Sequence, residues 1–353
     1  MLITDHNLRN ILKSISIEGG YHLGHPSILK DLIINNNNIS LKFSISNPSL
    51  QFKNKLKSQV NEIILTQFSQ AILSIEFIIE KTIKNIIAIA SGKGGVGKST
   101  ISSNLAIALK NQGYKVGVID ADIYGPSIPL MFDAENEKPK QVEQGGKYFM
   151  SPIESYGIKI MSIGFFARQG DAMVWRGPMA TKALKEIINN TAWGDLDYLL
   201  IDLPPGTGDI HLSIVQTLSI TGSIIITTPQ PVSIIDARKA INMFKNDTIR
   251  VPIIGVVENM SWLVIDNKKH YIFGKDGGKN LAEAENVNLL LEIPLDQTIR
   301  EAGDVGRPAA MQKSDLMDMF SELAQKVVNS IEKRNNILPP TKKVEITHNR
   351  GCN

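Results

Sequence analysis

Cysteine is almost absent from this sequence: its 353 residues include only one, Cys352, next to the C-terminal residue. A single thiol excludes a disulfide bond within the chain, and it excludes any metal centre that needs several thiolates from one chain. The sequence assigns no role to Cys352.

Long hydrophobic runs and a strong net charge are also absent. No apolar stretch approaches the roughly 20 residues of a membrane-spanning helix, and the first residues lack the charged and then apolar layout of a signal peptide. The net charge is only +3, which gives no reason to expect nucleic acid or an anionic membrane as a partner. These absences predict a cytoplasmic protein.

A glycine-rich segment follows the apolar run 86–90 and reads Gly-Lys-Gly-Gly-Val-Gly-Lys-Ser-Thr. A short buried strand that leads into glycines and then into a helix is the context of a phosphate-binding loop, because backbone N–H groups then converge on an anion. Lys98 would reach the β- and γ-phosphates of a nucleotide, and the hydroxyl of Ser99 would bind Mg²⁺. The predicted nucleotide-binding residues are Gly92, Lys93, Gly94, Gly95, Val96, Gly97, Lys98, Ser99 and Thr100.

From residue 86 onward, apolar segments alternate with helical patterns, which is typical of a mostly parallel sheet covered by helices on both faces. The predicted fold class is therefore α/β, a doubly wound sheet of the P-loop NTPase type, preceded by a small α+β domain. Predicted strands are 86–90, 116–119, 158–163, 198–201, 223–227 and 253–257. Predicted helices are 98–112, 180–190, 210–218, 234–244, 277–285 and 315–333.

The N-terminal part of the chain is rich in Ile, Asn, Ser and Lys. Apolar and polar residues alternate over 39–45, which predicts a half-buried strand, and the four asparagines 35–38 before it suit a turn. Apolar residues at helical spacing over 52–64 predict a helix. We divide the chain into a small α+β domain (1–80), a linker (81–85), a nucleotide-binding domain (86–334) and a flexible basic tail (335–353).

Acidic residues directly follow two of the predicted strands, where ligands of such a sheet bind. Asp202 follows four apolar residues, the position of an aspartate that supports a nucleotide-bound metal. Asp122 ends the sequence Asp-Ala-Asp at 120–122 and lies one turn beyond its strand, so its carboxylate could reach water at the γ-phosphate. For Asp122 alone a turn or cap would be the simpler interpretation, but three matching segments in one sheet favour a functional set.

Together these segments resemble the deviant Walker A ATPases, the group that contains MinD, ParA, the nitrogenase iron protein and the Mrp/ApbC iron–sulfur carriers. The resemblance is carried by the segments 92–100, 120–122 and 202–209, the last reading Asp-Leu-Pro-Pro-Gly-Thr-Gly-Asp. The chain is most similar to Mrp/ApbC, through the segments 123–127, 175–179, 258–261, 293–296 and 299–304. The N-terminal domain resembles, more weakly, a small domain related to iron–sulfur assembly factors.

The resemblance implies a homodimeric, Mg²⁺-dependent ATPase that binds iron–sulfur clusters and transfers them to target apoproteins. ATP binding would close the dimer, and hydrolysis would open it. The implied cofactors are ATP and Mg²⁺, with an iron–sulfur cluster by resemblance only, and the implied partners are a second copy of the chain and iron–sulfur client or assembly proteins. Lys93 would reach the γ-phosphate that the partner subunit binds, as a cation supplied in trans.

The resemblance also assigns roles within one site. Asp122 would position the attacking water, and Asn259 would hydrogen-bond the edge of adenine. Phosphates and Mg²⁺ would be held by Lys98, Ser99 and Thr100. The predicted catalytic residues are Lys93, Lys98 and Asp122, and the predicted metal-binding residues are Ser99 and Asp202.

The chain departs from the family at the cluster ligands. Mrp/ApbC proteins usually carry a Cys-x-x-Cys pair after the segment that matches 258–261, and the pairs of two subunits bridge one cluster. Ile265 and Lys268 occupy those positions here, and Leu50 takes the place of a cysteine in the N-terminal domain. His270 is one candidate additional ligand, although a lone histidine among lysines is more often a solvated side chain.

Two other functions remain open. A regulator or scaffold that resembles MinD or ParA would use the same ATPase without a cluster. Against it, the C-terminal segment offers no strong amphipathic membrane helix, and the net charge is small for DNA binding. A metabolic kinase is disfavoured by Lys93 and by the segment 202–209.

Overall fold

The computed structural model describes residues 3–17, 22–26, 28–45, 50–79, 83–144, 147–166, 177–339 and 341. The chain forms two compact units: Met1–Thr82 with Val142–Phe149, and Ile83–Gln141 with Met150–Asn353. Several positions that the sequence singled out lie outside the described residues, namely 81–82 of the predicted linker, Trp175, Arg176, and 340 and 342–353 of the predicted tail, which include Cys352.

The first unit is built on a three-stranded sheet of order β1-β2-β3. β1 and β2 are antiparallel, and the two-residue turn between them is made by Asn36 and Asn37. A helix then leads to β3, which runs parallel to β2, so the strand and the helix predicted here are confirmed. The elements are α1 (Asp5–Leu12), β1 (Leu29–Asn35), β2 (Asn38–Ile45), α2 (Leu50–Gln67) and β3 (Ile72–Ile79).

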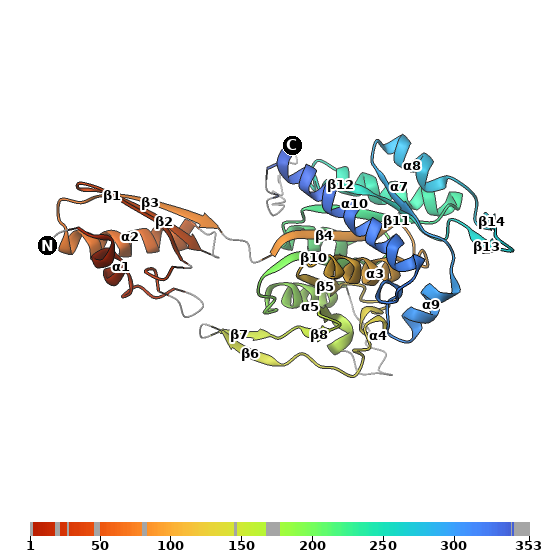
Figure 1. The fold of residues 1–353 in the computed structure, drawn as a ribbon, viewed down its shortest axis with the longest axis horizontal. Helices are drawn as coiled ribbons and strands as arrows, with labels where there is room; N and C mark the ends of the chain where they lie inside the picture. Colours follow the sequence, from red (N-terminus) through yellow and green to blue (C-terminus); the bar gives the residue numbers. More distant parts are fainter. Residues whose placement is uncertain are drawn as a thin grey trace, which may run out of the picture. The chain divides into compact units, whose positions relative to one another are not determined.

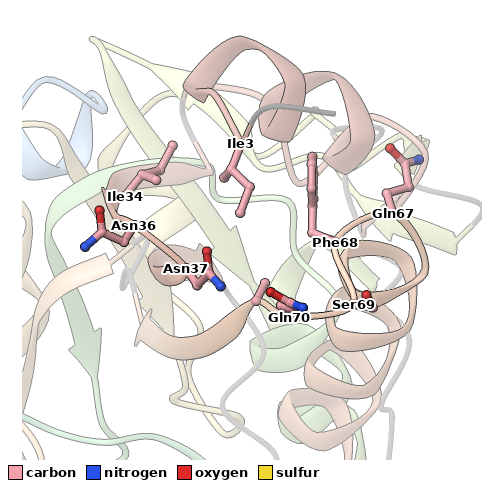
Figure 2. A pocket seen from close by; sticks show the side chains of 9 residues that line it. Ile3, Ile34, Asn36, Asn37, Gln67, Phe68, Ser69 and Gln70 are labelled. Atoms are coloured by element: carbon pink, nitrogen blue, oxygen red, sulfur yellow. The ribbon is translucent and has the colours of Figure 1, made fainter.

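A hollow of about 570 Å³ lies in this unit, bordered by the β1–β2 turn and the end of α2 (Figure 2). Amide and hydroxyl side chains share its wall with apolar ones, and none of the described residues that line it is ionisable. It therefore offers no charged partner for a phosphate or a metal ion. Its lining residues are Ile3, Ile34, Asn36, Asn37, Gln67, Phe68, Ser69, Gln70 and Ala71.

The second unit is built on an eight-stranded sheet of order β15-β12-β11-β4-β10-β5-β9-β8 (Figure 1). Neighbouring strands are parallel throughout, except that β8 is antiparallel to β9. The predicted doubly wound sheet is confirmed. The strands are β4 (Ile83–Ser91), β5 (Val116–Asp120), β8 (Ile153–Ser155), β9 (Ile158–Ser162), β10 (Leu196–Asp202), β11 (Gly222–Thr227), β12 (Ile253–Glu258) and β15 (Leu289–Glu292).

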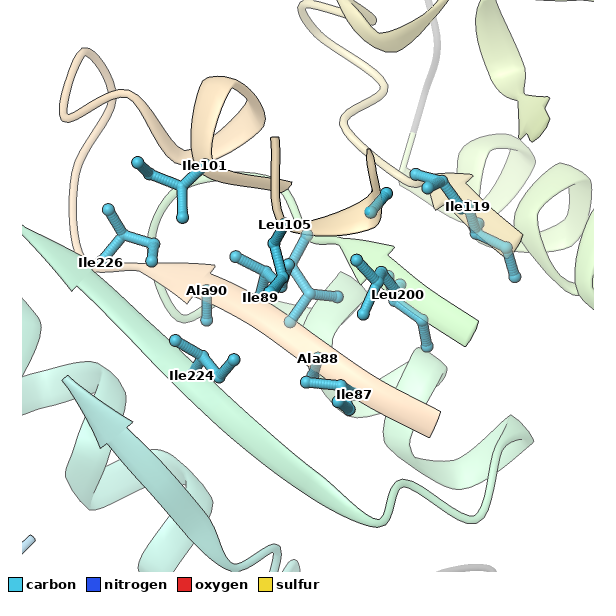
Figure 3. Close-up of a cluster of buried hydrophobic side chains, with 14 of the residues drawn as sticks. Ile87, Ala88, Ile89, Ala90, Ile101, Leu105, Ile119, Leu200, Ile224 and Ile226 are labelled. Atoms are coloured by element: carbon cyan, nitrogen blue, oxygen red, sulfur yellow. The ribbon is translucent and has the colours of Figure 1, made fainter. Parts of the chain in front are cut away.

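The centre of this sheet is buried on both faces. The strands β4, β10 and β11 carry nearly continuous apolar runs, and their side chains pack with Ile101 and Leu105 of the helix that follows β4 (Figure 3). Burial of β-branched side chains on both faces is the pattern of a central parallel strand. This packing fixes the carboxyl ends of the strands, where the polar residues lie.

Helices connect the strands and cover the sheet. α3 and α10 lie side by side (Figure 1), α5 packs against α6, and α7 packs against α8. None of the described helices combines the length and apolarity needed to cross a membrane. The helices are α3 (Lys98–Asn111), α4 (Ile128–Met131), α5 (Gly177–Asn189), α6 (Asp209–Thr217), α7 (Pro231–Lys245), α8 (Gly277–Glu285), α9 (Gln297–Asp304) and α10 (Asp315–Ile337), with 3₁₀ turns at Ile163–Phe166 and Ala309–Met311.

Most element boundaries differ from the prediction by one to three residues, and two elements extend past the predicted limits of the nucleotide-binding domain. β4 begins at Ile83, inside the predicted linker, because its first residues pair with β10. α10 continues to Ile337, into the predicted tail. The short strands β6 (Gln141–Gln144), β7 (Lys147–Met150), β13 (Leu263–Ile265) and β14 (Lys268–His270) were not predicted, since three or four residues show too little periodicity.

Candidate functional site

The candidate site lies where β4, β10 and β5 end. Asp202, at the end of β10, pairs in register with Asp120 of β5 on one side and with Ile89 of β4 on the other. The loop 92–97 leaves β4 at the same edge of the sheet and leads into α3. The structure thus brings together the segments that the sequence predicted to converge.

The loop 92–97 follows a path that requires glycine. Gly95 and Gly97 have φ angles of 80° and 84°, in the left-handed region that side chains disfavour. At Gly92, a Cβ atom would lie 2.0 Å from the backbone of Asp236 in α7. α7 therefore packs directly on a loop that stands at the N-terminus of α3, and such a loop is suited to bind an anion.

A cavity of about 210 Å³ opens over this loop. Every predicted loop residue from Lys93 to Thr100 lines it, together with Asp122 from the loop after β5 and Pro205 from the loop after β10. Gly92, Asp202 and Asn259 are not among its lining residues. Asp202 and Asn259 lie behind the wall of the cavity and form hydrogen bonds with two residues that line it, Lys98 and Val96.

The ammonium of Lys98 is the positive centre of the site. Its Nζ lies 2.7 Å from Oδ2 of Asp202 and 3.8 Å from Oδ2 of Asp122. The hydroxyl of Ser99 donates to the same oxygen of Asp202 over 2.6 Å. Asp202 is fully buried and Lys98 is 6% exposed. An ammonium has three donors, so Lys98 can keep Asp202 while it binds a phosphate oxygen.

Ser102, which the sequence analysis missed, holds the other oxygen of Asp202. Its hydroxyl donates to Oδ1 over 2.6 Å, and both residues are fully buried. Ser102 lies one helical turn after Ser99, so both hydroxyls face β10. No specific signal in the sequence pointed to this role, because Ser102 is one of several polar residues near the start of α3 and its partner lies on another strand.

One carboxylate oxygen of Asp122, Oδ1, is buried and makes no hydrogen bond with the described residues, and the side chain is 13% exposed. Burial raises the pKa of its carboxyl, and the nearby ammonium of Lys98 opposes this rise. A free buried acceptor beside the cavity fits a residue that holds a water molecule.

Asp120 anchors the loop that carries Asp122. Its carboxylate accepts the backbone N–H groups of Asp122 and Ile128, each over 3.2 Å, and the hydroxyl of Ser162 over 3.0 Å. Burial, and then the negative charge of Asp202, raise its pKa to about 7. Asp120 therefore positions the loop after β5.

Two side chains hold the phosphate loop in place. Nζ of Lys93 donates to Oε1 of Gln230, just before α7, over 3.1 Å. Nδ2 of Asn259, after β12, donates to the carbonyl of Val96 over 2.9 Å. Asn259 keeps a second N–H and its carbonyl oxygen for other partners, so its contact with adenine stays a prediction, as does the action of Lys93 in trans.

A buried histidine, also missed by the sequence analysis, fixes the loop after β10. His211 of α6 is 1% exposed, and its Nε2 lies 3.0 Å from the carbonyl oxygen of Pro204. We assign Nε2 as the donor, since a carbonyl can only accept. Burial lowers the pKa of the ring, which keeps it neutral. The N–H groups of Leu203 and Gly206 donate to the carbonyls of Ile89 and Ser91 over 3.0 and 2.9 Å, so the loop is tied to β4 as well as to α6.

A parallel sheet of this order, with a phosphate loop after a central strand, defines the class of the molecule as a P-loop NTPase. Comparison with known proteins identifies the family. The model of the NUBPL iron-transfer P-loop NTPase family matches residues 82–330. The chain belongs to this family.

Individual relatives agree. The "Iron-sulfur cluster carrier protein" of Escherichia coli (strain K12) is 46% identical over 261 residues, covering 73% of this chain and 69% of the relative. The Arabidopsis thaliana "Iron-sulfur protein required for NADH dehydrogenase, mitochondrial" is 47% identical over 255 residues, covering 71% and 80%. These matches favour the iron–sulfur interpretation over a MinD- or ParA-like regulator.

Among solved structures, a nucleotide-binding protein from Archaeoglobus fulgidus, in complex with ADP, is similar to this chain. The TM-score is 0.58 at 36% sequence identity, and the match covers 68% of this chain and 93% of the other. The similarity supports the P-loop NTPase fold that the strand order indicates.

The Ser102→Ala variant tests the hydroxyl behind Asp202. Without this donor, one buried oxygen of Asp202 loses its partner and the carboxylate no longer holds Ser99 firmly. We expect the Mg²⁺ concentration for half-maximal nucleotide hydrolysis to rise about tenfold, as a Mg²⁺ titration of turnover would measure. The matched control is Ser103→Ala, because that hydroxyl bonds to the backbone of Thr100 and not to Asp202. Equal effects of the two substitutions would contradict this role.

His211 can be tested with two substitutions of different chemistry. His211→Leu removes the donor to Pro204, so the loop after β10 loses its tie to α6, and we expect kcat for nucleotide hydrolysis to fall about tenfold. His211→Gln keeps an N–H donor and should stay within about threefold of the wild type. Nucleotide affinity, measured by titration, should change in neither. If Gln is as harmful as Leu, the hydrogen bond is not the cause.

Proposed function

We propose that this chain is a Mg²⁺-dependent ATPase that works as a homodimer in the transfer of iron–sulfur clusters to client proteins. The names of its relatives support the iron–sulfur role, and the phosphate loop supports the ATPase. The observation that carries the ATPase is the pair Lys98 and Ser99 at the wall of the cavity, both held by the buried carboxylate of Asp202 behind it. A cytoplasmic location remains the prediction made from the sequence.

The chemistry of the cavity suits a triphosphate with Mg²⁺. The backbone N–H groups at the start of α3 and the ammonium of Lys98 are donors for phosphate oxygens. The hydroxyl of Ser99 would bind Mg²⁺, while Asp202 holds this hydroxyl in position. Bound Mg²⁺ would neutralise charge on the β- and γ-phosphates. Asn259 is our candidate for the contact with adenine.

Asp122 is the proposed residue for water activation. Its partnerless Oδ1 would accept a hydrogen bond from the attacking water and orient it toward the γ-phosphate. Lys98 would stabilise the charge that grows on the phosphate oxygens. Lys93 of one protomer would add a second cation at the site of its partner, which requires that it exchange Gln230 for a phosphate oxygen.

The loop 203–208 is the proposed switch. Two of its ties, from Gly206 to Ser91 and from His211 to Pro204, are single hydrogen bonds near its middle. A γ-phosphate in the cavity would compete for the N–H of Gly206, since a charged acceptor binds more strongly than a carbonyl. Binding and hydrolysis would thereby change the loop, and with it the contact between protomers or with a client.

Lys98→Ala should greatly weaken nucleotide binding. The ammonium is the main charged donor of the cavity, so its loss should weaken binding of a fluorescent ATP analogue about 100-fold. Fluorescence titration measures this affinity, and circular dichroism checks that the variant is folded. The control is Lys239→Ala, which removes an exposed lysine paired with Asp236 on α7. Unchanged affinity in a folded Lys98→Ala variant would contradict the proposed ATPase.

Lys93→Ala should separate binding from hydrolysis. A cation supplied in trans contributes to the transition state, so we expect kcat to fall about 10³-fold while the affinity for ATP changes less than about threefold. Steady-state turnover and titration measure the two quantities. An equal loss of affinity and turnover would place Lys93 in its own subunit's site.

Mixing two inactive variants tests the action in trans directly. A heterodimer of Lys93→Ala and Asp122→Asn has one complete site, formed by Asp122 of the first protein and Lys93 of the second. ATP turnover should therefore reappear when the two are combined. Lack of recovery, with dimer formation confirmed by sedimentation, would rule out a composite site.

A further inference from the structure

The β13–β14 hairpin, Leu263–His270, stands where the family resemblance places the cluster ligands. Its turn consists of Asp266 and Asn267, with φ angles of 49° and 58°. Two positive φ values in a two-residue turn fit a tight hairpin. Ile265 and Lys268 flank the turn and pair directly in register, so their side chains emerge next to each other on one face.

The geometry of these two positions suits a pair of ligands, but their side chains do not. An iron–sulfur cluster is held by thiolate sulfur, usually four per cluster. The side chain of Ile265 has no donor atom, and the Lys268 ammonium has no lone pair to offer. Both residues are exposed. In the described part of the chain, no three His, Cys, Asp or Glu side chains come close enough to hold a metal ion.

The charge of the hairpin also opposes direct contact between two copies. The segment 262–279 contains four lysines and two aspartates. Lys269 lies over the ring of Trp262 at 3.6 Å, and Lys275 over the ring of Tyr271 at 5.2 Å, so both charges are held on the surface of this segment. Hairpins that face each other across a two-fold axis would place like charges together, which is unfavourable.

We propose that this chain holds no iron–sulfur cluster between two copies, because Ile265 and Lys268 replace the ligands, and that bound nucleotide alone joins the copies. The inference rests on the proposed function and specifies its partner. The cluster that is transferred is held by another protein. The ATPase acts on that protein through its own opening and closing.

The test is to supply the missing ligands. Ile265→Cys/Lys268→Cys in a Cys352→Ser background is compared with the wild type after anaerobic reconstitution with iron and sulfide under reducing conditions. Iron and sulfide content, the visible spectrum and the mass in sedimentation are measured. The wild type should stay free of iron under all conditions. It should be monomeric without nucleotide and should dimerise when Mg·ATP is added. The double variant should bind about two iron atoms per chain, as a four-iron cluster shared by two copies requires, and should dimerise without nucleotide.

Two results would overturn the proposal. Iron and sulfide in the wild type, with dimers in the absence of ATP, would show that other residues hold a cluster. If that iron disappears in the Cys352→Ser variant, the terminal thiol is the ligand. If neither protein takes up iron, residues 265 and 268 are not what keeps the hairpin free of a cluster. ATP turnover of the same preparations tests the proposed ATPase separately, since neither substituted position lines the phosphate cavity.

Discussion

The buried carboxylate of Asp202 is the interaction on which the site depends. It takes three donors at once, from Lys98, Ser99 and Ser102. A buried charge is tolerable only when it is paired and hydrogen-bonded, and removing one partner of a buried pair typically costs about 3–5 kcal/mol. The pairing fixes the start of α3 relative to the end of β10. The position at which the loop 92–97 joins α3 is therefore fixed, and a phosphate site requires such a fixed loop.

The phosphate loop is also held by elements that lead away from the site. The backbone of α7 packs against Gly92, and Gln230, just before α7, accepts a hydrogen bond from Lys93. Asn259, after β12, donates a hydrogen bond to the loop. The β13–β14 hairpin begins four residues after Asn259. A change of the loop on nucleotide binding must therefore be accommodated by α7 or by the segment after β12. This connection links the phosphate loop to the β13–β14 hairpin through the chain segment after β12.

The sequence predicted the sheet and the phosphate loop because each has a local signature: long apolar runs, glycines at fixed spacing and aspartates after strands. Ser102, Gln230 and His211 could not be found in this way. Their partners are set by tertiary packing, as with Ser102 and Asp202, which are 100 positions apart. β15 was missed for a related reason, since four residues at the edge of a sheet show no periodicity.

Membership of the family does not by itself show that this chain binds an iron–sulfur cluster. That property depends on two side chains, Ile265 and Lys268. The phosphate site involves many residues that constrain one another, so a match there fixes the chemistry firmly. The hairpin turn needs only Asp266 and Asn267, and it accepts any exposed pair beside them. Dimers bridged by a cluster come apart when the cluster leaves, whereas dimers joined by ATP come apart when it is hydrolysed. Under the proposed mechanism, in which nucleotide alone joins the copies, the lifetime of the closed state would depend on the rate of hydrolysis, and so on Asp122 as the residue proposed to orient the attacking water.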